Sequence, residues 1–86
     1  MKIDAFNFTI YDVETVHKSL IAELESSDVL EIDMASVEKV DMAALQLLVS
    51  AKLSCKEENK TFTLSNLCDE VQSSIMMSGL DAELGV

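Results

Sequence analysis

The side chains with catalytic potential are few in this sequence. His17 is its one histidine, and the chain has no arginine, no tryptophan and no proline. It also lacks a glycine-rich phosphate loop, since its two glycines are Gly79 and Gly85, and its cysteines, Cys55 and Cys68, do not form a C-x-x-C pair. Most catalytic templates cannot be assembled from this inventory, so we expect no enzyme activity and no catalytic residue.

The ionisable groups that remain are better explained by helix ends than by a reactive site. His17 falls about one turn from Val13 and Leu20 in an expected helix, where a surface histidine without a metal partner is the simplest interpretation. The acidic pairs at 57–58 and 69–70 are typical of solvated helix termini. We therefore expect no metal site and no cofactor.

The composition limits the class of protein. Apolar residues make up 49% of the 86 residues, while 16 acidic side chains face six lysines for a formal charge of −10. Nucleic-acid binding depends on clustered basic residues, so nucleic acid is excluded as a partner. No apolar run approaches the roughly 20 residues of a spanning helix, and Met1–Asp4 begins no secretory apolar region. We expect one cytoplasmic domain over residues 1–86, with free thiols and no direct membrane insertion.

The first half of the chain predicts a strand, a helix and a second strand. Ile3–Ile10 is rich in β-branched and aromatic residues, and places Phe6, Phe8 and Ile10 on one face of a strand. Asp12 is expected to cap a helix that runs to about residue 26. The helix has an apolar stripe of Val13, Val16, Leu20 and Leu24. A short strand follows at 29–34, with Leu30, Ile32 and Met34 on one face.

The second half predicts two more helices and a third strand. Residues 35–40 form a connector, and Asp41 begins a long stretch of good helix formers that ends near residue 58. Thr61–Ser65 alternates as a strand. Cys68, Val71 and Ile75 mark a last helix, which should stop at Gly79 with Leu80 folded back on the final turn.

This order of elements is typical of an α/β domain. Alternating strands and helices favour crossovers that stack helices on a mainly parallel sheet. Because the chain is short, we expect a small sheet with helices packed on one face.

The helix that begins after Asp41 has two apolar arcs. The first, which should face the sheet, consists of Ala44, Leu47, Leu48, Ala51 and Cys55. The second consists of Met42, Leu45, Val49 and Leu53. Either a neighbouring helix covers the second arc or a partner does, and that partner could be a second copy or a different protein. Asp41 itself is expected to be the N-cap, which contributes about 1 kcal/mol.

Several of these segments together resemble the core motif of STAS domains, the anti-sigma factor antagonist family. The run Val29–Met34, the connector ending Val37–Asp41 and the helix start Met42–Leu48 are similar to a buried strand that leads to Asp-Ser-Ser-Gly-Leu or Asp-Thr-Ala-Gly-Leu. The resemblance continues with Asn59–Leu67 and Met77–Leu80 and covers about residues 12–84. It implies a single STAS-like α/β domain.

The resemblance also implies a function in regulatory binding. Members of the family dock through the motif helix onto partners such as ATP-binding anti-sigma kinases, and many are switched by phosphorylation of the hydroxyl residue after the motif Asp. Met42 occupies that position, Ala43 replaces a second hydroxyl and Ala44 replaces the usual glycine. We expect a non-catalytic antagonist-like module that is not phosphorylated at this site. The expected partner-binding residues are Asp41, Met42, Ala43, Leu45, Gln46 and Val49.

Two other functions stay open at this point. STAS-like domains also occur in transport systems for lipids and anions, so the protein could be a cytoplasmic accessory subunit of a membrane transporter. The run Ala44–Leu48 is also similar to adaptors of chemotaxis-type signalling. An enzyme is the third class, and it would require a deep pocket that holds His17 beside a carboxylate.

Overall fold

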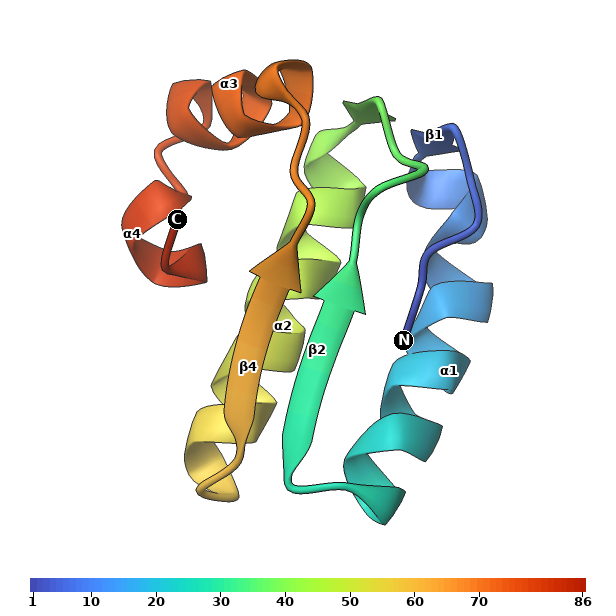
Figure 1. Cartoon of the computed structure of the whole chain (residues 1–86), viewed down its shortest axis with the longest axis vertical. Helices are drawn as coiled ribbons and strands as arrows, with labels where there is room; N and C mark the ends of the chain where they lie inside the picture. Colours follow the sequence, from blue (N-terminus) through green and yellow to red (C-terminus); the bar gives the residue numbers. More distant parts are fainter.

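Two long helices cover one face of a parallel sheet in the computed structural model, which describes residues 1–86 (Figure 1). Strands β2 (Val29–Asp33) and β4 (Thr61–Ser65) pair in parallel from Val29 opposite Thr61 to Asp33 opposite Ser65. Helix α1 (Ile10–Ser26) packs on β2, and helix α2 (Met42–Glu57) packs on β4 and on α1. The predicted α/β class with parallel strands is confirmed.

A second, shorter ladder lies beyond the end of the first. Strand β1 (Asn7–Phe8) pairs in parallel with β3 (Lys39–Val40), inside the segment predicted as a connector. The start of the chain joins β2 through a bridge between Lys2 and Asp33, where the Ile3 amide donates to the Asp33 carbonyl at 3.1 Å.

The predicted strand Ile3–Ile10 is therefore wrong over most of its length. Phe8 is fully buried, but Phe6 and Ile10 are 59% and 61% exposed. The reason is the helix that begins at Ile10: the Tyr11 amide donates to the Thr9 hydroxyl at 3.3 Å, and the Thr9 amide donates to the Asp12 carboxylate at 3.0 Å. Thr9 is the N-cap, and Asp12 closes a capping box instead of being the N-cap itself.

The other predicted elements agree with the structure. β4 has the predicted bounds, Leu30, Ile32 and Met34 are buried, and α2 starts and ends within a residue of its predicted limits. Helix α3 (Asp69–Met77) ends in a Schellman motif, in which the Gly79 amide donates to the Met76 carbonyl and the Leu80 amide to the Ile75 carbonyl. Gly79 has φ = 77°, which glycine adopts without a steric penalty.

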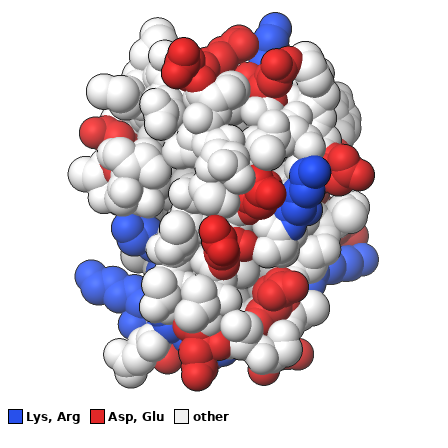
Figure 2. Space-filling model, viewed as in Figure 1, with Lys and Arg blue, Asp and Glu red and all other residues white.

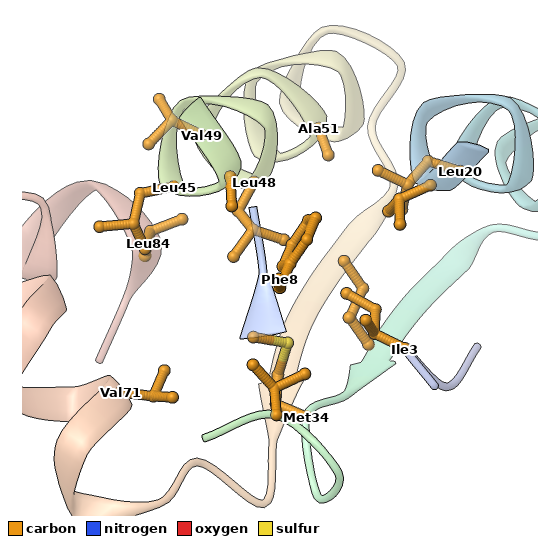
Figure 3. Close-up of a cluster of buried hydrophobic side chains, with 14 of the residues drawn as sticks. Ile3, Phe8, Leu20, Met34, Leu45, Leu48, Val49, Ala51, Val71 and Leu84 are labelled. Atoms are coloured by element: carbon orange, nitrogen blue, oxygen red, sulfur yellow. The ribbon is translucent and has the colours of Figure 1, made fainter. Parts of the chain in front are cut away.

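The core consists of 17 buried residues, all of them apolar (Figure 3). It fills the space between the sheet and the two long helices and extends under α3 and the short helix α4 (Asp81–Leu84). No buried side-chain nitrogen or oxygen lacks a hydrogen bond. None of the helices combines the length and the apolar character that crossing a membrane requires.

Candidate functional site

Asp41 joins the starts of the two long helices. One carboxylate oxygen, Oδ1, accepts a hydrogen bond from the Ala44 amide at 2.9 Å and so caps α2, as predicted. The other, Oδ2, accepts from the Ile10 amide at 2.9 Å, at the first turn of α1. A single carboxylate therefore satisfies orphan amides of two helices and holds the two helix starts side by side.

Large apolar side chains stand exposed around this carboxylate. Met42, the first residue of α2, is 52% exposed, and Ile10 and Tyr11, the first two residues of α1, are 61% and 92% exposed. The Gln46 amide group, one turn along α2, donates to the Met42 sulfur at 3.9 Å. We call Ile10, Tyr11, Met42 and Gln46 the helix-start patch. Large apolar side chains that lie exposed close together are typical of contact sites.

The predicted contact surface along α2 is corrected at two positions. Leu45 is 3% exposed and Val49 is 8% exposed, so neither side chain offers a partner more than a small part of its surface. Figure 3 shows Leu45 and Leu84 directed towards one another, because α4 packs on this side of α2. A neighbouring helix, not a partner, covers the middle of the second apolar arc.

The remaining predicted site residues stay near the surface. Gln46 is exposed, Ala43 is half-buried and the Asp41 carboxylate is engaged with two amides. Leu53, the last residue of the second arc, is 55% exposed at the other end of α2. The structure thus divides the second arc into an open start, a sealed middle and an open end.

Ile10 and Tyr11 were missed because the first helix was predicted to begin later. The signal lies in the sequence: Thr9 is followed three residues later by Asp12, which is the spacing of a capping box. That spacing places residues 10 and 11 in the first helical turn, and both side chains are exposed there. Their position beside Met42 follows only from the contact between the two helix starts.

The titratable groups form no reactive cluster. His17 is exposed on α1. Hydrogen bonds from the Asn66 side chain and the Ala35 amide lower the pKa of Asp33, which lies at the end of β2. Burial raises the pKa of the Cys55 thiol, so its reactive thiolate is disfavoured. No group of three or more His, Cys, Asp or Glu side chains is placed to hold a metal ion.

Fold and site together define a small α/β module with an exposed apolar patch at two adjoining helix starts. A family model described as "Mlab, STAS domain" matches residues 7–86. The chain therefore belongs to this family of STAS domains, and the predicted resemblance to STAS domains is confirmed.

A solved structure supports the same fold. The crystal structure of a sulfate transporter family protein from Wolinella succinogenes is similar to this chain, with a TM-score of 0.84 and 20% sequence identity. The similarity covers 99% of this chain and 69% of that one. No curated protein matches the chain.

Proposed function

We propose that this protein is a non-catalytic interaction module that binds another protein through the helix-start patch. The observation that supports the proposal is the exposure of Met42 beside Ile10 and Tyr11, on backbone that the Asp41 carboxylate holds in place. Burying an apolar side chain of this size contributes about 1.5–3 kcal/mol, so a few such residues can anchor an interface. Methionine also adapts its shape to an irregular partner surface.

Binding of this kind is constitutive. Met42 stands where the resemblance to antagonist-type STAS domains places the phosphorylated hydroxyl, and a thioether accepts no phosphate. The switch that adds a charge of about −2 at this helix start is therefore absent from the chain. Regulation of binding therefore acts on the partner or on the amount of complex that forms.

The partner that we favour is a cytoplasmic subunit of a membrane transport system. Two observations support it: the similar solved structure is that of a sulfate transporter family protein, and the chain lacks the motif hydroxyl on which antagonist switching depends. The second candidate is an ATP-binding anti-sigma kinase, supported by the likeness of residues 29–48 to the antagonist motif.

The test compares two substitutions of equally exposed residues at different places. Met42→Asp puts a charge in the patch, and Val29→Asp puts the same charge at the start of β2, where Val29 is 53% exposed. Tagged wild type and both variants are used to capture partners from the native cell, and the partner is identified by mass spectrometry. Its affinity is then measured with purified proteins.

We expect Met42→Asp to weaken binding at least about tenfold, because a carboxylate loses its hydration inside the interface. Val29→Asp should bind like wild type. Equal affinity of all three proteins would show that the helix-start patch is not part of the interface. The identity of the captured partner separates the two candidates: a transporter subunit or an ATP-binding kinase.

A further inference from the structure

Strand β4 has one edge without a partner. The Thr61 amide donates to the Asp28 carbonyl at 2.9 Å, and the Ser65 carbonyl accepts from the Met34 amide at 2.9 Å. The backbone groups of Thr61 and Ser65 therefore face β2. Alternate residues of a strand direct their backbone groups to opposite edges, and Phe62 and Leu64 therefore direct theirs away from β2. Neither residue makes a backbone hydrogen bond to another part of the chain.

This edge lacks the usual protection against strand addition. Exposed edges are normally blunted by a lysine, a proline or a bulge, or are covered by another element. β4 has the sequence TFTLS, with no charge and no proline, and it pairs with β2 in continuous register. Figure 1 shows the edge directed towards the side on which α4 lies, with no strand beyond it. The backbone groups of Phe62 and Leu64 can therefore receive an added strand.

A groove opens on the same side of the molecule. It lies between α2 and α4, and α2 in turn packs on β4. Its volume is about 450 Å³. The residues that line it are Val49, Lys52, Leu53, Lys56, Ala82 and Glu83. A strand added to β4 would direct every second side chain towards the helix layer, in which α2 forms one wall of this groove.

The charge of the groove is opposite to that of the whole protein. The chain carries −10, but two lysines and a single carboxylate, that of Glu83, line the groove. Neither Lys52 nor Lys56 forms a salt bridge, since the two salt bridges of the chain involve Lys18 and Lys60. Figure 2 shows lysine side chains gathered on the side towards which the free edge points. Two unpaired cations beside apolar surface attract an acidic ligand that also has apolar side chains.

We propose that the free edge of β4 and the groove between α2 and α4 receive an extended acidic segment of a partner protein, which adds to the sheet as a strand. The backbone of the segment pairs with the amides and carbonyls of Phe62 and Leu64. Its apolar side chains contact Leu53, and its carboxylates lie near Lys52 and Lys56. This is strand addition, a recognised mode of peptide binding, and it is independent of the helix-start patch.

Two blocked heptapeptides serve as probes, one alternating Glu with Val and the other alternating Lys with Val. Each is added to the complete ¹⁵N-labelled chain, and hydrogen exchange is followed at the Phe62 and Leu64 amides. We expect the acidic peptide to slow exchange at both amides at least about tenfold, because a hydrogen-bonded amide exchanges only when the bond opens. The basic peptide should leave both rates unchanged. The Thr61 and Thr63 amides, on the β2 side, are internal references.

A matched pair of variants tests the charges. Lys52→Glu with Lys56→Glu should weaken acidic-peptide binding at least about tenfold, and Lys2→Glu with Lys18→Glu, an equal change in net charge, should weaken it less than about twofold. Met42→Asp should have no effect on peptide binding, so this proposal and the proposed function fail separately. Equal protection by both peptides, or by neither, overturns the proposal. Protection that rises with protein concentration in the absence of peptide also overturns it, because the occupant is then a second copy.

Discussion

The start and the middle of α2 present the same apolar arc to two different surroundings. In the middle, Leu45 and Val49 are sealed by α4, whereas at the start Met42 stays half exposed. The four-residue helix α4 packs on α2 at the middle of the arc and not at its start, which accounts for this difference. Apolar periodicity therefore identifies the surfaces that need a cover, and it does not show whether the same chain supplies the cover.

The start of α2 can stay open because Asp41 already caps it. Asp41 accepts hydrogen bonds from the amides of Ala44 and Ile10, so no further element is required to pair them. Leaving Met42 uncovered costs the protein only the transfer free energy of that side chain. The sealed middle thus serves stability, and the open start is free to serve binding.

The largest expected effect is on stability, and it distinguishes the buried middle of the arc from its exposed start. Leu45→Ala should lower the free energy of unfolding by about 2–5 kcal/mol, because it leaves a cavity between α2 and α4. Met42→Ala should lower it by less than about 0.5 kcal/mol, since Met42 is largely solvated. Urea denaturation of both variants measures the difference. Similar losses for the two substitutions would contradict the division of the arc.

A second prediction tests whether α4 covers the middle of the apolar arc. Leu84→Ala should cost about 2–3 kcal/mol, less than Leu45→Ala, because a four-residue terminal helix can detach without unfolding the rest. Detachment would expose Leu45 and Val49, so the variant should bind a hydrophobic dye more strongly than wild type. Ala82→Gly, an exposed change in the same helix, is the control for lost helix propensity. Unchanged dye binding would show that α4 does not seal the arc.

Long, locally determined elements were predictable from sequence. α2 is built of good helix formers behind an Asp N-cap, and β4 alternates cleanly between turn residues, so local preference and tertiary packing agree there. The Schellman ending at Gly79 was also predictable, because helices commonly end at a glycine in the left-handed conformation.

The elements that were missed depend on distant contacts. β3 has two residues and exists only because it pairs with β1, some 30 residues earlier in the chain. α4 has four residues, too few to form without the packing of Leu84 on α2. The helix-start patch depends on the hydrogen bond between Asp41 and Ile10, which no periodicity encodes. Met42 and Gln46 were therefore predicted from sequence, whereas Ile10 and Tyr11 were found only from the fold.

A third prediction concerns the carboxylate that supports the open start. Asp41→Ala should cost about 1–2 kcal/mol, because two helix-terminal amides lose their acceptor. Asp41→Asn should cost less, since its one carbonyl oxygen can still accept from one of them. The backbone chemical shifts of Ile10 and Ala44 should both move in the alanine variant. A shift confined to Ala44 would show that Asp41 caps α2 without positioning α1.

The smallest expected effect is the one that separates folding from binding. Met42→Asp places a carboxylate at the first helical position, where the helix dipole favours it by a few tenths of a kcal/mol and the neighbouring Asp41 opposes it. The free energy of unfolding should therefore stay within about 0.5 kcal/mol of wild type in urea denaturation, while capture of the partner is lost. Ile10→Asp should behave in the same way from the start of α1, because its side chain is equally free of core contacts. A loss of more than about 1 kcal/mol in either variant would mean that the side chain supports the fold, and the weaker binding could then be ascribed to unfolding.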